Sequence, residues 1–248
     1  RLGRVAPILE SAPPAPAWHP WVILLTAPVV LTLWWYFGRF PFYNSSVASL
    51  VPPGPYEPVY PFVYFTLSSV LLRGLVPMLV IVAVLRQPLS RFGWRLKGTF
   101  DLWYVYLLLV LLAVPMVWLA SAGQGFQDTY PQCRRMLRGG AIRTEHFILF
   151  QVCYLFVFAS GESFWRGFLS FGLFRSVRWL AIPIMVVPYV MIHFGKPFPE
   201  TAGALMAGLI LGTLALKHGS FWLGVMTHYS VALWMDVAAM IRQGIILV

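Results

Sequence analysis

The sequence predicts an all-α fold, a polytopic bundle of about seven membrane-spanning helices. Two compositional features support this: 59% of the 248 residues are hydrophobic and only 10% are charged. An ordinary soluble domain carries roughly a quarter charged residues, so this chain has too few to cover a hydrated surface. The apolar residues also gather into runs near the length of about 20 residues that a spanning helix needs. We therefore expect an integral, multi-pass membrane protein, most simply of the cell membrane.

The first part of the chain is predicted to hold a tail and three spanning helices. Residues 1–20 contain five prolines and indicate an extended tail, without the apolar core and cleavage site of a signal peptide. The proline-rich stretch 41–61 cannot be helical throughout and is expected to be an interfacial loop. Apolar runs predict the three spans within residues 21–145, at 21–37, 62–85 and 102–120.

Residues 146–248 are expected to form a catalytic helical core that makes one integral domain with residues 21–145. Apolar runs predict four further spans, at 146–173, 180–193, 202–216 and 221–241. No repeat of fixed period relates them, which disfavours a transporter built from duplicated halves, or a proton relay.

The charge pattern fits a membrane better than a nucleic acid. The net charge of +10 arises from 18 Lys and Arg against 8 Asp and Glu, and the cations lie between apolar runs, where lipid headgroups account for them. Residues 86–98 carry four cations and no acid, which predicts a cytoplasmic loop and a cytoplasmic N-terminus. Residues 121–145 then fall outside with four arginines, so the membrane face to which a site opens is left undecided.

A few ionisable residues fall inside the apolar runs, where each charge costs about 2.5–3.5 kcal/mol and therefore needs a partner or a purpose. Glu162 and Arg166 are four residues apart, so their side chains can meet on one helix face. The arginine would keep the carboxylate ionised, as a general base for water needs, although a purely structural pair fits equally well. The full set is Arg73, Glu162, Arg166, His193, His228 and Asp236.

The two intramembrane histidines favour a catalytic interpretation. His193 ends the fifth apolar run and His228 lies inside the last one. Taken singly, each is more simply a packed core histidine. Together with Glu162 and Arg166 they occupy three separate spans, and side chains converging from three helices can line one wet cavity.

These residues lie in three motifs that resemble those of the CPBP intramembrane protease family. The family includes CAAX-processing endopeptidases and Abi-like proteins of bacteriocin processing or self-immunity. The resemblance covers about residues 147–239 and rests on GESFWRGFL, YVMIHFGKP and GVMTHYSVALWMD. Glu162 and Arg166 match the glutamate and arginine of the first motif. Tyr189 and His193 match the aromatic residue and histidine of the second, and His228 matches the histidine of the third.

The resemblance implies an endopeptidase that cleaves a membrane-anchored or lipidated protein without a cofactor. In this scheme Glu162 takes a proton from water, His193 orients that water and His228 donates to the oxyanion. Arg166 keeps Glu162 ionised and fixed. Tyr189 and Asp236 are expected only as substrate-contacting or supporting residues.

Two alternatives remain open. A zinc protease could use Glu162, His193 and His228 as ligands, although no HExxH spacing is present. A noncatalytic scaffold or immunity protein could keep the fold and lack the full motif. This second alternative is suggested because Gly161 stands where the family has its first glutamate, and Ala232 stands where it has a polar residue.

Overall fold

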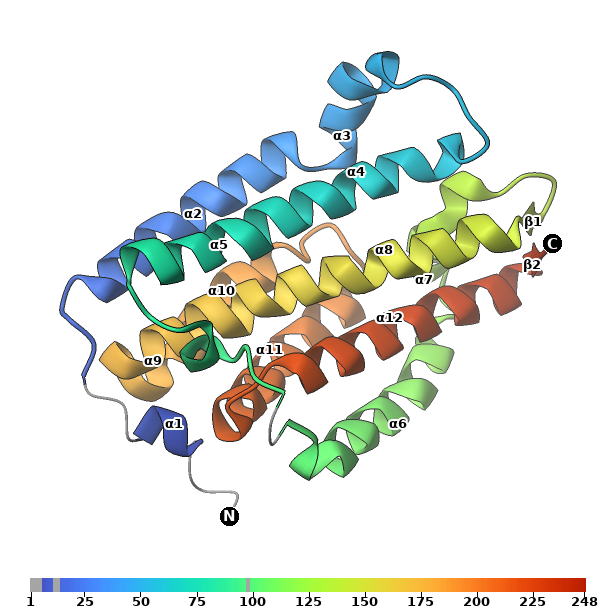
Figure 1. Ribbon diagram of the computed structural model, residues 1–248. Helices are drawn as coiled ribbons and strands as arrows, with labels where there is room; N and C mark the ends of the chain where they lie inside the picture. The colour runs from blue at the N-terminus through green and yellow to red at the C-terminus, as the bar shows by residue number, and fades with distance from the viewer. Residues whose placement is uncertain (1–5, 11–13, 97–98) are drawn as a thin grey trace.

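The computed structural model describes residues 6–10, 14–96 and 99–248, and it shows a bundle of long helices (Figure 1). In this described part, the strands are a two-residue parallel pair, β1 (Ala141–Ile142) and β2 (Ile246–Leu247). The prediction of an all-α bundle is therefore confirmed.

Every apolar run predicted to span the membrane is helical. The second run forms one continuous rod, the α4–α5 rod, in which two π-helical segments, Val70–Leu75 and Val80–Val84, alternate with the α-helices. The fourth run is α8, followed by the π-helical segment Ser163–Phe171 and then α9. The α-helices in the predicted spans are α2 (His19–Phe37), α4 (Tyr60–Ser69), α5 (Val76–Leu79), α6 (Trp103–Ala120), α8 (Thr144–Glu162), α9 (Gly172–Val177), α10 (Ala181–Met191), α11 (Phe198–His218) and α12 (Trp222–Gln243).

Length and apolar composition identify five stretches of the described residues that could cross a membrane, which supports a multi-pass integral membrane protein. The count is lower than the predicted seven for two reasons. The fourth and fifth predicted spans fall in one stretch, and α12 is not among the five. The stretches are His19–Phe37, Glu57–Val84, Thr99–Ala120, Thr144–Met191 and Phe198–His218.

The prediction that the N-terminal tail is extended is wrong for part of its length. Residues Pro7–Glu10 form a short helix, α1, and the Leu9 side chain is buried in the main hydrophobic core. The backbone N–H of Ala6 donates to the carbonyl oxygen of Leu216 at 3.1 Å. An apolar side chain can thus fix a short helix against the bundle despite the prolines around it. The rest of the predicted tail within residues 1–5 and 11–13 lies outside the described residues.

The loops also contain short helices. The proline-rich stretch predicted as a loop includes α3 (Phe40–Phe42) and short 3-10 and π turns, and α4 begins at Tyr60, two residues earlier than predicted. Pro61 occupies the first turn of α4, where proline removes no helical hydrogen bond. Between α6 and α8 lie α7 (Gln124–Thr129) and a 3-10 turn at Gln132–Met136.

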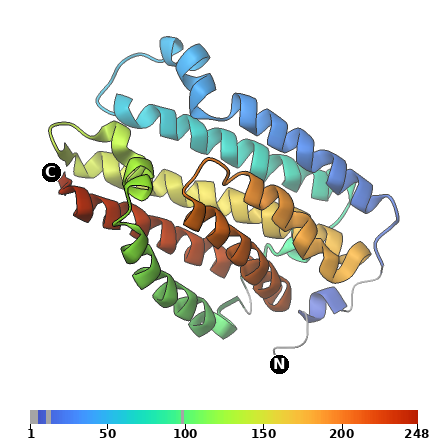
Figure 2. The same cartoon turned by 180° about the vertical axis from the view of Figure 1, so that it is seen from behind.

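Helix α8 and its continuation run through the middle of the bundle. The α4–α5 rod packs on one side of α8 and α12 on another, while α6 packs against α12 at the edge (Figure 1). Helices α10 and α11 pair with each other on the face of the bundle that is nearer the viewer in Figure 2. All residues of the π-helical segment Ser163–Phe171 are buried. The segment that follows Glu162 is therefore the most enclosed part of the fold.

Candidate active site

Glu162 and Arg166 meet in the interior of the bundle. Glu162 is the last residue of α8, and Arg166 lies one turn further along in the π-helical segment. Arg166 Nη1 donates to Glu162 Oε1 at 2.8 Å, and both side chains are fully buried. Such a pair is favourable in a low dielectric when its geometry is good and its remaining polar atoms are hydrogen-bonded. Here the contact itself is short, but Arg166 Nε and Glu162 Oε2 have no partner among the described residues.

His228 reaches the same carboxylate oxygen from α12. Its Nδ1 lies 3.0 Å from Glu162 Oε1, 66 residues away along the chain. With a carboxylate as acceptor, Nδ1 carries the proton and donates it to this hydrogen bond. The His228 side chain is 26% exposed, whereas Glu162 is fully buried, so the histidine stands between the carboxylate and the outside of the bundle.

The surroundings of the second carboxylate oxygen, Oε2, are different. Glu162 Oε2 is buried and accepts no hydrogen bond from the described residues. Gly224 in α12 faces it, and a Cβ added at Gly224 would lie only 3.0 Å from Oε2. The absence of a side chain at Gly224 therefore leaves room beside the oxygen that has no protein donor.

Tyr189 forms one wall of this site. It is 1% exposed, and the guanidinium of Arg166 lies 4.5 Å from the centre of its ring. Its ring centroid is 6.4 Å from that of His228. Arg166 also donates from Nη2 to the carbonyl oxygen of Ala207 at 3.4 Å, which ties the site to α11.

His193 lies beside Tyr189, just beyond the end of α10. Its Nδ1 donates to the Tyr189 carbonyl oxygen at 2.8 Å, and the two ring centroids are 5.0 Å apart. Thr201 Oγ1 donates to the His193 carbonyl oxygen at 2.9 Å. No hydrogen bond of the described residues joins His193 to Glu162. The structure thus connects Glu162, Arg166 and His228 directly, and His193 is adjacent to them through Tyr189.

Asp236 is not hydrogen-bonded to these residues. Its side chain is fully buried in α12, and Oδ1 accepts the backbone N–H of Gln132 at 2.7 Å. Asp236 therefore fastens the segment before α8 to α12. Ala232, one turn earlier, packs in an apolar cluster and offers no side-chain donor.

A cluster of three polar side chains next to His193 was not predicted from the sequence. Lys196 Nζ and the Tyr130 hydroxyl both donate to Glu200 Oε1, at 2.6 and 2.8 Å. Burial, followed by the effect of nearby charges, raises the pKa of Tyr130 well above its usual value, so the hydroxyl keeps the proton it donates. The spacing of four residues between Lys196 and Glu200 could have predicted that these two side chains pair. The group joins the α10–α11 loop to the segment after α7.

The zinc alternative does not fit this geometry. Among the residues that the structure describes, no three His, Cys, Asp or Glu side chains gather closely enough to hold a metal ion. Of the three proposed ligands, only His228 contacts Glu162, and it does so through a hydrogen bond.

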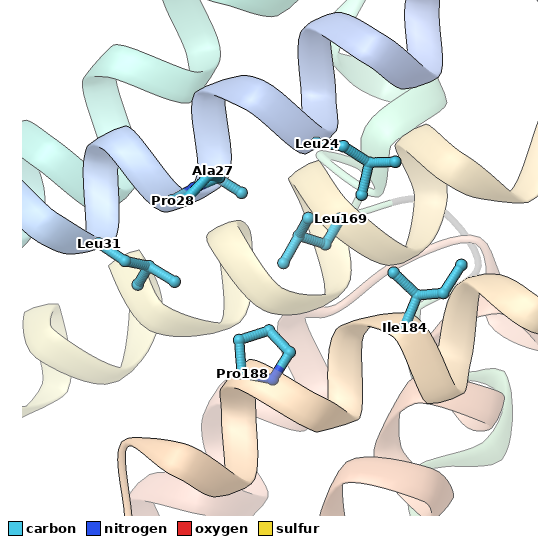
Figure 3. A pocket seen from close by; sticks show the side chains of 7 residues that line it. All are labelled: Leu24, Ala27, Pro28, Leu31, Leu169, Ile184 and Pro188. Atoms are coloured by element: carbon cyan, nitrogen blue, oxygen red, sulfur yellow. The ribbon is translucent and has the colours of Figure 1, made fainter.

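An apolar groove of about 200 Å³ lies between α2, the π-helical segment and α10 (Figure 3). It contains no ionisable side chain, and Pro188 at its edge directly precedes Tyr189. The groove is therefore a hydrophobic surface next to the site and does not contain the reactive groups. Its lining residues are Leu24, Ala27, Pro28, Leu31, Leu169, Ile184 and Pro188.

Comparison with known proteins agrees with the motifs. Residues 143–234 match the family model described as type II CAAX prenyl endopeptidase, Rce1-like. This match confirms the resemblance to the CPBP family and supports a CAAX-type intramembrane protease at the level of the family. It includes the positions from Glu162 to His228 and ends before Asp236. No curated protein and no solved structure matches the chain.

Proposed function

Given the match of residues 143–234 to the Rce1-like, or CPBP, protease family, we propose that this chain is a glutamate-dependent intramembrane endopeptidase. Its substrate is a membrane-anchored or lipidated protein that reaches the site from the bilayer. One observation carries the proposal: Glu162 Oε1 is shared by Arg166 and His228, while Oε2 is buried and accepts no hydrogen bond from the residues that the structure describes.

Glu162 acts as the general base. Two donors occupy Oε1 and hold the carboxylate in one orientation, and Arg166 places a positive charge beside it. Oε2 then takes a proton from the water that attacks the scissile carbonyl carbon. When the tetrahedral intermediate collapses, the C–N bond breaks and the same proton passes from Glu162 to the leaving amine.

The two histidines assist at the water and at the oxyanion. His193 donates from Nδ1 to the Tyr189 carbonyl, so Nε2 of the neutral ring is an acceptor that can orient the attacking water. His228 directs Nδ1 at Glu162, which leaves Nε2 as the ring atom that, when protonated, donates to the oxyanion. One such donor contributes about 10²–10³ in rate.

A noncatalytic scaffold or immunity protein of the same fold is the competing function. Gly161 and Ala232 favour it, because neither supplies the carboxylate or the polar group that the family motifs have at these positions. Ala232 is 6% exposed and packed among apolar side chains, so it contributes nothing to the oxyanion. On this account Glu162 is only one half of a structural ion pair.

Separate Glu162→Gln and His193→Ala variants distinguish the two functions. The purified full chain in lipid vesicles is given a membrane-anchored peptide, and cleavage is followed by mass spectrometry. We expect Glu162→Gln to lower kcat by at least about 10²-fold, because the amide cannot take the proton. Glu57→Gln, which changes an exposed carboxylate, is the matched control and keeps the wild-type rate. Wild-type rates in both folded site variants would show that catalysis is the wrong function.

Exhaustive chelation separates the two protease mechanisms. A glutamate-dependent enzyme keeps its cleavage rate after treatment with a strong chelator. Loss of cleavage that returns only on addition of zinc would instead support the zinc-dependent version.

A further inference from the structure

Arg73 is a buried cation without an acidic partner in the described part of the chain. It lies in the π-helical segment Val70–Leu75 of the α4–α5 rod and is 4% exposed. Its Nη2 donates to the Val157 carbonyl oxygen at a long 3.4 Å, and its Nε has no acceptor. The guanidinium stacks 4.3 Å from the Trp34 ring, which provides a weaker electrostatic contact than a carboxylate would.

Such a charge calls for an anion. A guanidinium stays protonated at neutral pH, and an uncompensated charge inside a membrane protein is costly, so buried cations are normally paired. Arg166, the other arginine in this region, is already matched by Glu162. Arg73 therefore leaves one positive charge in the interior that these side chains do not balance.

The free edge of Arg73 faces Gly161 in α8. A Cβ built at Gly161 would lie 3.6 Å from Arg73 Nη1 and 3.9 Å from the indole Nε1 of Trp165, both at ordinary contact distance. Two N–H donors thus border a position where the chain supplies no side chain. A carboxylate, with two acceptor oxygens and one negative charge, has the chemistry that this position lacks.

This position shares a wall with the candidate active site. Gly161 directly precedes Glu162, and Trp165 directly precedes Arg166. The Trp165 ring also contacts Tyr189, with ring centroids 5.7 Å apart. A carboxylate held by Arg73 would therefore lie over the residue that directly precedes the proposed general base, Glu162.

We propose that Arg73 and Trp165 form a carboxylate-binding subsite over Gly161, which anchors the substrate beside Glu162. The substrate part of this inference rests on the proposed function, but binding of a carboxylate does not. The carboxylate can come from a free C-terminus of the substrate or from an acidic side chain, and these two sources differ in the experiment below.

Binding is tested first with formate, the smallest carboxylate. Thermal unfolding of the purified full chain is followed in sodium formate and in sodium chloride of equal ionic strength. Formate should raise the unfolding midpoint of the wild type in a saturable way, because a ligand that binds the native state stabilises it. Arg73→Gln should weaken the apparent affinity for formate by about tenfold to a hundredfold, since a charged hydrogen-bond partner is lost.

Gly161→Glu keeps Arg73 and attaches a carboxylate to the subsite, so it covers the case in which Arg73→Gln fails to fold. It should remove the response to formate, whereas the matched Gly161→Ala variant should retain it, because a Cβ makes only ordinary contacts there. Equal unfolding midpoints in formate and chloride for the wild type would overturn the subsite. An undiminished formate response in Gly161→Glu would do so as well.

Two further arms separate this inference from the proposed function. Glu162→Gln should keep the formate response and lose cleavage, so that either result can fail alone. With active enzyme, a peptide with a free C-terminus is compared with its C-terminal amide, each with and without an acidic side chain. If the subsite binds the C-terminal carboxylate, amidation should raise KM by about tenfold or more in the wild type but not in Arg73→Gln. If it binds an acidic side chain, removal of that side chain should have this effect instead. A KM that depends on neither carboxylate would contradict an anchoring role.

Discussion

Replacing Arg166 with methionine should destabilise the folded chain by about 3–5 kcal/mol, the usual cost of removing one member of a buried ion pair. Arg166 and Glu162 are both fully buried, with Nη1 and Oε1 2.8 Å apart. After the substitution, Glu162 keeps only the 3.0 Å contact with His228, whose side chain is 26% exposed. This free energy corresponds to roughly a hundredfold to a few thousandfold in the ratio of folded to unfolded chain.

The double variant Arg166→Met with Glu162→Leu is the matched control. It replaces both charges by apolar groups of similar size, so the isolated buried carboxylate disappears and most of the lost stability should return. Cleavage should stay absent, because the double variant has no general base. Stability that returns without activity would separate the structural cost of the pair from its chemical role.

The assay is reversible unfolding in mixed micelles, with a denaturing detergent titrated and the free energy of unfolding compared among wild type, single and double variants. A single variant within about 1 kcal/mol of the wild type would refute the buried pair, because that loss is typical of exposed ion pairs. A double variant no more stable than the single one would refute the isolated carboxylate as the cause.

Two smaller changes test the surroundings of the carboxylate. Gly224→Ala places a Cβ 3.0 Å from Glu162 Oε2 and should slow cleavage about tenfold to a hundredfold with little change in unfolding midpoint, while Gly203→Ala, with no atom within 4 Å, should leave the rate unchanged. Equal cleavage rates for these two alanine variants would place the reacting water elsewhere. Tyr130→Phe removes the 2.8 Å hydrogen bond to Glu200 and should cost about 1.5–3 kcal/mol in the same unfolding titration. A loss below about 0.5 kcal/mol would mean that Lys196 alone holds Glu200.

Local sequence patterns predicted the helices and one pair of the site. Apolar run length identified each long helix, because bilayer thickness sets a length that composition reveals directly. The meeting of Glu162 and Arg166 followed from a spacing of four residues on one helix. Both features depend on residues close together in the chain, which is why a single sequence was enough.

The remaining features depend on tertiary packing. The contact of His228 with Glu162 joins residues 66 positions apart, so their meeting was expected from the resemblance of the motifs and from polar residues on separate spans, and not from local spacing. Arg73 and Gly161 are likewise on different helices, and no pattern predicted their contact. In the π-helical segment Ser163–Phe171, the polar residues Ser163, Arg166 and Ser170 recur at the spacing of an ordinary amphipathic helix, yet every position is buried. The sequence pattern therefore reveals neither the burial nor the altered turn. The short helix α1 depends on a place for Leu9 in a core made by distant segments.

The most direct test is cleavage of a lipidated, membrane-anchored peptide by the purified full chain in water enriched in oxygen-18. If Glu162 activates water, the wild type releases a fragment whose new C-terminal carboxylate carries one heavy oxygen, and folded Glu162→Gln produces at least about 10²-fold less of it. Equal amounts of labelled fragment from the wild type and the folded Glu162→Gln variant would contradict the role of Glu162.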